Sequence, residues 1–471
     1  MKDSRECRKL IGHILLTLIG ISLFLFSGYN IHEAEAAKKS TVDKELTDEE
    51  ISCQNARYIM GEDGIWHLRD VPDHNLMFDS IKEELTYLAE INKAEKNGDF
   101  LKILELSVKR MNKIYKASIK KEQEKSAVCM FVGDVMCLKG QQYSAAVKGG
   151  YDFEPSYSYV KKVFKTADFV CGNLETLLSE SNPITKDKVT AANGSPQCNG
   201  PVSLLKALRK SGFDMFVTVN NHTCDWGPTG IKETKTHLEE YGFPNVGTHY
   251  NTKNEKKAGE RFAIFDVNGI NVAVLAYSHL INQRGYLSSD EMKTMVHCFD
   301  RKTVKADIEA AREKGADIVV VYCHWGIENT ETLNSTQLND SQFLADAGAD
   351  LVIGSHPHCL QKCSYLTSES GKKVLCMYSM GNFCSSMSRD INNDTLILRI
   401  VIGRNSGEDG GRYEINEAAY IPCRVTTISG HSWVVVPTSK KLNGGYSSSV
   451  LDGAKKRIAK IIDGVIPEYQ G

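Results

Sequence analysis

The sequence predicts an α/β fold in which helices cover both faces of a sheet, behind an N-terminal membrane segment and a helical spacer. From Ala127 onward, short apolar runs alternate with helix-like segments, and this alternation is typical of such sheets. Two later runs, Thr395–Ile402 and Ala418–Ile428, have no helical segment between them and are expected to pair antiparallel. Before position 127 the chain has a basic flank, a long apolar run and a charged, helix-prone stretch.

The N-terminal residues have the pattern of an export signal. The run from Leu10 to Phe26 is mostly apolar, and its length lies near the lower limit of the roughly 17–25 residues of a membrane span. Four basic residues stand before it: Lys2, Arg5, Arg8 and Lys9. Ala34-Glu35-Ala36 resembles a cleavage signal, and a buried core helix fits poorly because the run has no polar face. We therefore expect residues 1–36 to be a signal peptide or membrane anchor, and the chain beyond them to be extracytoplasmic, either anchored or secreted.

The length, charge and apolar pattern of the chain indicate how its domains are organised. A chain of 471 residues is long enough for one large domain with appendages or for two domains. Its 57 Lys and Arg residues nearly balance its 59 Asp and Glu residues, which argues against a nucleic-acid partner and against wholesale disorder. Residues 37–125 predict a helical spacer, because apolar residues from Phe78 to Leu106 recur at helical spacing. A main domain over 126–440 and a C-terminal helix or tail over 441–471 complete the predicted organisation.

Fourteen cysteines in an exported chain would ordinarily indicate a disulfide framework. Four of them, however, lie inside or at the ends of apolar runs that predict buried strands: Cys129, Cys171, Cys323 and Cys376. A free cysteine in such a position behaves as a small hydrophobic residue. We therefore expect most cysteines to be free thiols, as a reducing exterior would maintain them.

Eight apolar runs are expected to form strands of the α/β part: Ala127–Val132, Asp168–Cys171, Asp214–Val219, Phe262–Val267, Val272–Tyr277, Asp317–Cys323, Leu351–Ile353 and Val374–Tyr378. Between them, Val202–Ser211 and Arg301–Lys314 have helical spacing and are expected to cover the sheet. A terminal helix near Ser449–Ile462 is expected to close the fold.

Polar residues stand where several of these runs end. In an open α/β sheet, ligands bind beyond the carboxyl ends of the strands, so this placement indicates a site. Asp134, Glu175 and Asn221 each follow a different run, although Asp134 after Gly133 would by itself suit a turn or a helix cap better than a ligand position. Asn221 is followed by His222, and Asp225 stands close enough in the chain to orient that imidazole.

Two further runs end in histidines. His324 stands beside Trp325, where a structural core histidine is an equally good interpretation of the residue alone. His356-Pro357-His358 is more specific, because histidines two apart in an extended segment point to the same side. Pro357 favours an extended residue before it, and Gly354 permits a close backbone approach.

Together the strand ends supply mixed oxygen and nitrogen ligands for metal ions: Asp134, Glu175, Asn221, His324, His356 and His358. Such a set suits Mn, Fe or Zn better than Ca or Mg. We expect two divalent ions about 3.5–4 Å apart, a pair that generates hydroxide near neutral pH and clamps an in-line displacement. The alternative is a structural zinc site made of His356, His358, Cys359 and Cys363, which leaves the other strand ends unexplained.

Six segments, in this order, resemble one known family: Gly133-Asp134, Gly172-Asn173-Leu174-Glu175, Asn220-Asn221-His222, His324-Trp325-Gly326 with Glu328, Gly354-Ser355-His356-Pro357-His358, and Ser379-Met380-Gly381-Asn382-Phe383. Over roughly residues 126–430 the chain is similar to CapA-type poly-γ-glutamate capsule biosynthesis proteins, within the calcineurin-like metallophosphoesterase superfamily. The resemblance implies a metallophosphoesterase-like layered β-sandwich flanked by helices, and a CapA-like domain over residues 126–440.

The resemblance also implies roles for individual residues. Asp134 would be a metal ligand, and Glu175 would take the bridging place that an Asp holds in most of the superfamily. The remaining ligands would be Asn221, His324, His356 and His358, and His222 would donate a proton to the leaving group. Three residues would be accessory positions on the substrate side: Asn173, Glu328 and Asn382. Met136 stands where the superfamily usually has a His, so the second ion is expected to be weakly held.

Two functions compete at this point. As an enzyme, the protein would hydrolyse a phosphoester, or an amide of a γ-glutamyl polymer or cell-wall peptide, with His222 protonating the leaving group. As a non-catalytic component, it would bind an anionic polymer within a membrane-bound capsule synthesis and export complex. His222 beside Asn221 favours catalysis, and Met136 favours the second function. A Ser-His-Asp hydrolase is disfavoured because no Gly-x-Ser-x-Gly turn is present. The expected partners are an anionic polymer or phosphoester substrate, the cell membrane and membrane-bound capsule synthesis proteins, and no nucleic acid.

Overall fold

The computed structural model describes residues 57–68, 87–109 except 88 and 100, and 125–471 except 193, 251–260 and 405–411. The expected signal peptide or membrane anchor, residues 1–36, lies outside the described residues. Within the described part of the chain, no helix is both long and apolar enough to cross a membrane.

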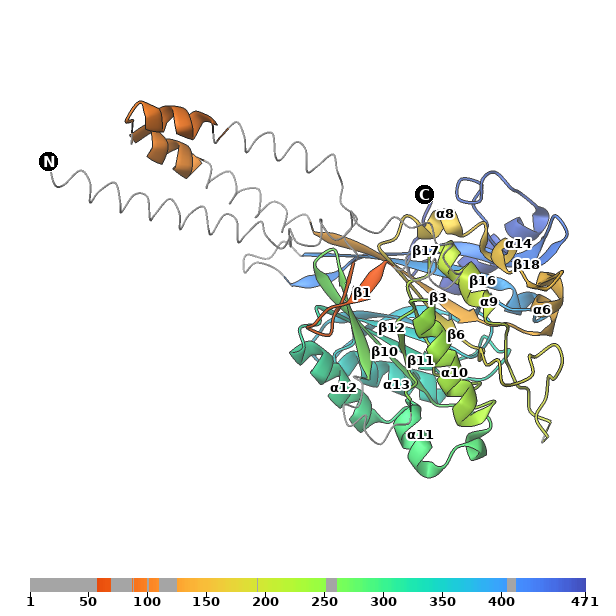
Figure 1. Cartoon of the computed structure of the whole chain (residues 1–471). Coiled ribbons are helices and arrows are strands. Elements are labelled where there is room, and N and C mark those ends of the chain that lie inside the picture. The colour runs from red at the N-terminus through yellow and green to blue at the C-terminus, as the bar shows by residue number, and fades with distance from the viewer. Residues whose placement is uncertain are drawn as a thin grey trace. The chain divides into compact units, whose positions relative to one another are not determined.

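Two large sheets dominate the described residues (Figure 1). The strands of the first, sheet A, are β1 (Tyr58–Met60), β2 (Trp66–Leu68), β9 (Phe262–Val267), β10 (Ile270–Ser278), β11 (Ile318–His324), β12 (Leu351–Ser355), β13 (Cys363–Thr367) and β14 (Lys373–Met377). They are arranged in the order β1-β2-β9-β10-β11-β12-β14-β13. The strands β10, β11, β12 and β14 run parallel, so their carboxyl ends lie at one edge of the sheet.

The strands of the second sheet, sheet B, are β3 (Ser126–Val135), β6 (Phe169–Leu174), β7 (Met215–Val217), β8 (Asn245–Val246), β15 (Asn382–Cys384), β16 (Asp394–Arg404), β17 (Tyr413–Ile428) and β18 (His431–Pro437). Their order is β18-β17-β16-β3-β6-β7-β8, with β15 beside β3. The strands β3, β6, β7 and β8 are parallel. The expected antiparallel pairing of the two later runs is confirmed, because they form β16 and β17.

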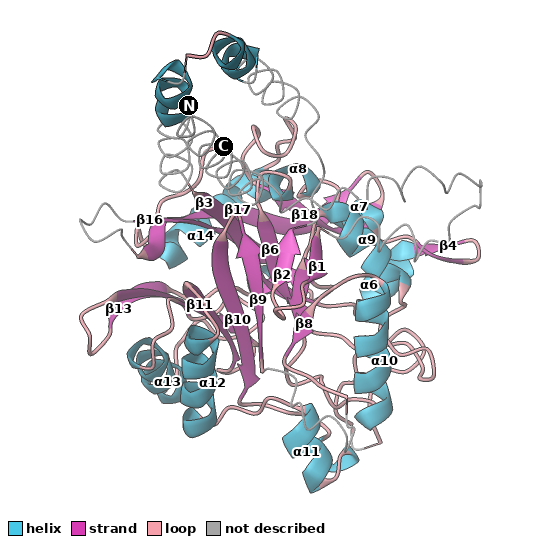
Figure 2. Ribbon diagram, turned by 60° about the vertical axis from the view of Figure 1, so that its left-hand side comes forward, coloured by secondary structure: helices cyan, strands magenta, loops and turns pink. Residues whose placement is uncertain are grey.

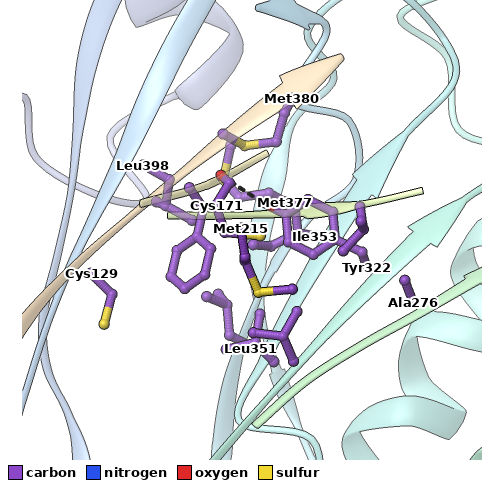
Figure 3. Close-up of a cluster of buried hydrophobic side chains, with 14 of the residues drawn as sticks. Cys129, Cys171, Met215, Ala276, Tyr322, Leu351, Ile353, Met377, Met380 and Leu398 are labelled. Carbon is purple, nitrogen blue, oxygen red and sulfur yellow. Dashed lines mark hydrogen bonds between the residues drawn. The ribbon is translucent and has the colours of Figure 1, made fainter. Parts of the chain in front are cut away.

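The main apolar core lies between the inner faces of the two sheets (Figure 3). Successive side chains of β3 point to opposite faces of sheet B, and both faces are buried. Phe131 packs in this core, whereas Met130 and Val132 belong to a second apolar cluster on the outer face. Tyr322 of sheet A faces sheet B, and its hydroxyl donates a hydrogen bond to the carbonyl oxygen of Cys171 at 3.2 Å. The sheets are therefore joined by a polar contact as well as by apolar packing.

Helices cover the outer faces of both sheets (Figure 2). The helices are α6 (Lys139–Ala145), α7 (Glu154–Tyr157), α8 (Lys161–Phe164), α9 (Ser203–Ser211), α10 (Gly227–Glu240), α11 (Ser289–Met295), α12 (Arg301–Glu313), α13 (Ser335–Asp346) and α14 (Ser449–Ile462). Four short elements also occur: β4 (Ala146–Val147), β5 (Gly150–Tyr151), η1 (Arg284–Tyr286) and η2 (Asp390–Asn392). Apolar residues of α8, α9 and α10 pack on sheet B, and those of α12 and α13 pack on sheet A. The predicted mixed α/β fold is confirmed. The expectation of helices on both faces of one sheet is wrong, because the inner face of each sheet packs against the other sheet and helices cover only the outer faces.

Part of the predicted helical spacer has a different structure. Residues Tyr58–Met60 and Trp66–Leu68 are strands at the edge of sheet A rather than helix. They are held by long-range contacts, because the Tyr58 ring packs edge-on against Phe169 and Phe265. The helix expected between residues 78 and 106 is interrupted where it is described: helical residues 89–96 and 101–109 are separated by a turn in which Gly98 has a φ of 67°.

The described cysteines are all free, and eleven of these twelve are buried. The expectation of free thiols is therefore confirmed for them. The terminal helix is also confirmed, because α14 has the predicted bounds and packs Ala454, Ile458 and Ile462 into the main core.

Candidate metal centre

The parallel strands of both sheets bring the predicted ligands to one place. Sheet B supplies Asp134 near the end of β3, Glu175 directly after β6 and Asn221 in the turn after β7. Sheet A supplies His324 as the last residue of β11, and then His356 and His358 directly after β12. All six side chains are buried. The ligands thus divide equally between the two sheets, at the edge where the carboxyl ends of the parallel strands meet.

The two carboxylates are linked by a buried amide. Asn173 Nδ2 donates to Asp134 Oδ1 at 2.8 Å and to Glu175 Oε2 at 3.3 Å. Its own oxygen accepts a hydrogen bond of 3.3 Å from Asn220 Nδ2, which fixes the orientation of the Asn173 amide. Burial, followed by the negative charge of Asp134, raises the pKa of Glu175 well above its ordinary value. A cation between the carboxylates would remove this repulsion.

The histidines enclose the same space. His324 Nε2 lies 3.0 Å from Asn221 Oδ1 and 3.7 Å from Glu175 Oε1. His356 Nδ1 lies 3.1 Å from His324 Nε2. His358 lies 3.5 Å from Asp134 Oδ2 through Nδ1 and 3.7 Å from Glu175 Oε1 through Nε2. The donor atoms of two groups each lie within 4.8 Å of one another: Asp134, Glu175 and His324 in one group, and Glu175, His356 and His358 in the other.

These residues fit divalent metal ions. Glu175 belongs to both groups, and its buried Oε1 atom has no hydrogen-bond partner. Burial and neighbouring histidines lower the pKa of His324 well below its usual value and that of His356 to about 3, so both imidazoles are neutral, as metal ligation requires. Burial also acts against protonation of His358, but its contact with Asp134 outweighs this effect and raises its pKa. Oxygen and imidazole donors without a thiolate match Mn, Fe or Zn.

The backbone around the two neighbouring histidines differs from the prediction. His356 and His358 have φ values of 95° and 55°, so the segment is bent rather than extended, and the expected extended geometry is wrong. The histidines converge because the chain turns back through left-handed conformations, which a non-glycine residue adopts only where its surroundings compensate. The predicted close approach at Gly354 is confirmed, because a Cβ atom there would overlap the Tyr378 carbonyl oxygen.

His222 and Asp225 form a buried pair beside the six ligands. His222 Nδ1 lies 2.7 Å from Asp225 Oδ2, and this same oxygen accepts the backbone N–H of Cys198 at 2.6 Å. Burial raises the pKa of Asp225 more than its pairing with His222 lowers it. The pair holds the imidazole with Nδ1 turned toward Asp225, which leaves Nε2 as the ring atom available to other groups.

The accessory residues divide into two kinds. Asn173 bridges the carboxylates, and Asn382 Oδ1 lies 3.0 Å from His358 Nδ1. Glu328 is exposed, and among the described residues no hydrogen bond or ion pair joins it to the cluster.

Met136 is buried directly after β3. The groups of close donors in the described chain include neither Cys359 nor Cys363, which removes the support for the alternative zinc site.

Three site residues had not been predicted. Ser355 Oγ lies 2.8 Å from His324 Nδ1, and Asn220 orients Asn173. Both adjoin predicted ligands in the sequence, so their positions could have indicated them. Cys198 lies in a loop between β6 and α9, far along the chain from its neighbours His222 and Asp225, and no local pattern marks it.

The similarity of this chain to known proteins covers the segment that contains the six candidate ligands. The model of the family described as "Bacterial capsule synthesis protein PGA_cap" matches residues 128–387. PGA biosynthesis protein CapA of Bacillus subtilis is 27% identical over 286 residues, which are 60% of this chain and 69% of that protein. Capsule biosynthesis protein CapA of Bacillus anthracis is 27% identical over 287 residues, 60% of this chain and 66% of that protein. The chain thus aligns with about two thirds of the length of each relative.

Solved structures that resemble this chain have lower sequence identity to it than the two relatives above. NAD nucleotidase of Haemophilus influenzae superposes with a TM-score of 0.41 at 11% identity, covering 72% of this chain and 60% of that one. Calcineurin-like phosphoesterase YfkN of Bacillus subtilis superposes with a TM-score of 0.37 at 13% identity, covering 72% of this chain and 98% of that one.

Proposed function

The chain belongs to the PGA_cap family of bacterial capsule synthesis proteins, and on this premise we propose that it is a metal-dependent hydrolase of a capsule or cell-envelope polymer. The bond attacked is a phosphoester or a γ-glutamyl or related amide. The observation that carries the proposal is Glu175, a buried carboxylate with an unpartnered oxygen that two donor groups share. A carboxylate in this position is suited to bridge two ions.

Each residue of the site has a defined task in this proposal. The metal-holding residues are Asp134, Glu175, Asn221, His324, His356 and His358. When bound, a pair of divalent ions would supply an activated water and stabilise negative charge at the reacting centre. Asp225 accepts the Nδ1–H of His222, so His222 delivers a proton to the leaving group from Nε2. Asn173 keeps the carboxylates in place, and Asn382 orients His358.

One observation favours a second, non-catalytic function. Met136 is buried and offers no imidazole where the wider superfamily usually has one, so one ion has fewer ligands than the other. A single firmly held ion would suffice to bind an anionic polymer or to stabilise the domain within a membrane-bound capsule synthesis complex. The basic and apolar N-terminus supports export and membrane association for either function.

The test separates metal binding from proton donation. The full chain is analysed for bound metals and assayed with phosphodiester and γ-glutamyl substrates, alongside three His→Ala variants at positions 358, 222 and 237. His358→Ala should lose both metal and activity. His222→Ala should keep the metal of the six-ligand cluster and lose about 10²- to 10⁴-fold in kcat, the usual contribution of a general acid. His237→Ala is the matched control, because His237 lies on α10 and pairs with Glu240 away from the cluster.

Two outcomes would count against the proposal. Hydrolysis that survives both His358→Ala and His222→Ala would exclude the catalytic site as drawn. A correctly folded wild type that binds its metal but hydrolyses neither substrate class would favour the non-catalytic function.

A further inference from the structure

A second group of donor side chains adjoins the six-ligand cluster without sharing a residue with it. Cys198, His222 and Asp225 present donor atoms that all lie within 4.8 Å of one another. All three side chains are buried, and Asp225 is 0% exposed. They come from two separate loops, one before α9 and one before α10, so the fold brings them together.

The group is only partly satisfied by hydrogen bonds. Asp225 Oδ2 accepts from His222 Nδ1 and from the Cys198 backbone, but the buried Oδ1 atom has no partner. The neighbouring Gln197 donates its side-chain amide N–H to the Asp225 carbonyl, and its own Oε1 is likewise buried without a partner. Buried polar atoms are ordinarily paired, so the unpaired carboxylate oxygen of Asp225 indicates a missing electropositive partner.

A nucleophilic cysteine explains this group less well. In a Cys-His-Asp arrangement the thiol hydrogen-bonds to the imidazole, and no such bond joins Cys198 to His222 among the described residues. Burial, followed by the carboxylates Asp225 and Glu175, also raises the pKa of the Cys198 thiol well above its ordinary value. The same negative surroundings favour a cation beside the sulfur.

We propose that Cys198, His222 and Asp225 form a further site for a thiophilic divalent cation of the zinc class. One sulfur, one imidazole nitrogen and one carboxylate oxygen match the ligands of zinc, and the soft sulfur discriminates against Mg²⁺ and Ca²⁺. Binding releases the thiol proton to solvent, so the ion is held by a thiolate, a carboxylate and a neutral imidazole.

Occupation of this site withholds His222 from proton transfer, because a nitrogen lone pair of the ring is then engaged by the ion. Zinc-class ions therefore inhibit the protein at concentrations above those that fill the six-ligand cluster. This regulatory consequence rests on the proposed function, whereas the binding site itself does not.

The test uses cadmium as the probe, because a thiolate–cadmium bond has an ultraviolet charge-transfer absorption that carboxylate and imidazole ligands lack. The six-ligand cluster contains no cysteine, so cadmium bound there is silent in this assay. The full wild-type chain is titrated beside Cys198→Ser and Cys224→Ser. Cys224 is the matched control, because it is buried and adjacent to Asp225 in the chain, yet its thiol is directed at the sulfur of Met292, 4.0 Å away.

Wild type and Cys224→Ser should show the same absorption band, and zinc should displace it. Cys198→Ser should lose it and bind the ion at least about tenfold more weakly, since even outer-shell changes at metal sites cost this much. An unchanged band and affinity in Cys198→Ser, with Cys198→Ala as a second variant should the first misfold, would overturn the proposal.

Inhibition is measured separately. Zinc should inhibit wild type and Cys224→Ser. Half-inhibition of Cys198→Ser, with each variant compared with its own zinc-free rate, should require about tenfold more zinc. Equal inhibition of all three would overturn the regulatory role. Failure of the proposed function would appear instead as absent hydrolysis in every variant, while the cadmium band still reports on the site.

Discussion

At the scale of single residues, the site depends on glycines that stand just before its ligands. A Cβ atom at Gly133 would overlap the carbonyl oxygen of Gly381, and one at Gly354 would overlap that of Tyr378. Gly133 immediately precedes Asp134, and Gly354 stands two residues before His356. The absence of a side chain therefore allows neighbouring backbones to approach so closely that the ligand side chains converge.

Gly354→Ala is expected to destabilise the protein by at least about 3 kcal/mol, the upper range for overpacking, because the obstacle is rigid backbone rather than a flexible side chain. It should also reduce the metal content, since His356 and His358 would shift. Thermal unfolding and elemental analysis measure both effects. Gly150→Ala is the control, because nothing lies within 4 Å of a Cβ there. An equally small effect of both substitutions would refute this account of Gly354.

At the scale of elements, the segment 57–68 is part of the folded domain rather than a spacer. Its ion pair with a buried carboxylate is the main polar contact: Arg57 Nε donates to Asp214 Oδ1 at 2.8 Å, and Arg57 Nη1 donates to the Ala167 carbonyl at 2.7 Å. The Tyr58 hydroxyl adds a hydrogen bond of 2.8 Å to the Asp168 carbonyl. These contacts tie Arg57 and the first residue of β1 to the residues just before β6 and β7 of sheet B, while β1 and β2 extend sheet A.

Arg57→Ala should destabilise the protein by about 2 kcal/mol. This is below the roughly 3–5 kcal/mol of a fully buried pair, because the Arg57 side chain is 32% exposed. Denaturant unfolding of the full chain measures the change. Lys210→Ala provides the comparison, since it breaks an exposed pair with Glu154 and should alter the stability by less than about 1 kcal/mol. Similar losses in both variants would contradict the role assigned to residues 57–68.

The elements also show what a sequence reveals and what it does not. Helices such as α9, α12 and α14 were predicted closely, because their periodicity is a local property of the chain. The two-residue strand β8 and the edge strands β1 and β2 were missed, because pairing with distant strands creates them.

The same distinction holds for the site. The convergence of the six candidate ligands could be predicted because each stands at or just after the end of an apolar run. The left-handed backbone at His356 and the position of Cys198 could not, because they depend on tertiary packing that no local pattern encodes.

At the scale of the whole molecule, a histidine pair joins the segment after β8 of sheet B to the segment after α11; His297 is buried and His249 is partly buried. His249 Nε2 and His297 Nε2 lie 2.5 Å apart, and His297 Nδ1 lies 3.2 Å from the Ala276 carbonyl. Burial, followed by the charges of Lys235 and Arg261, lowers the pKa of His249 to about 4. Burial lowers the pKa of His297 well below its ordinary value. Both rings are therefore neutral in the folded protein near pH 7.

Acidification should destabilise the fold through this pair. In the unfolded chain these histidines titrate near pH 6.5, so the unfolded state binds more protons below that value. The free energy of unfolding is therefore undiminished by His249 above about pH 6.5 and decreases as the pH falls toward about 4. The decrease due to His249 is on the order of 2 kcal/mol. Unfolding free energies of wild type and His249→Gln across this range measure the effect. Parallel curves for the two proteins would show that His249 makes no such contribution.

The division of the ligands between the sheets has a consequence for the order of events in folding. Asp134, Glu175 and Asn221 belong to sheet B, while His324, His356 and His358 belong to sheet A. Neither sheet alone carries a complete set, so tight metal binding would begin only after the two have docked. Metal ions captured at that late stage would contribute little to the rate of folding. They would act instead on unfolding and slow it, because separating the sheets would break up the ligand set.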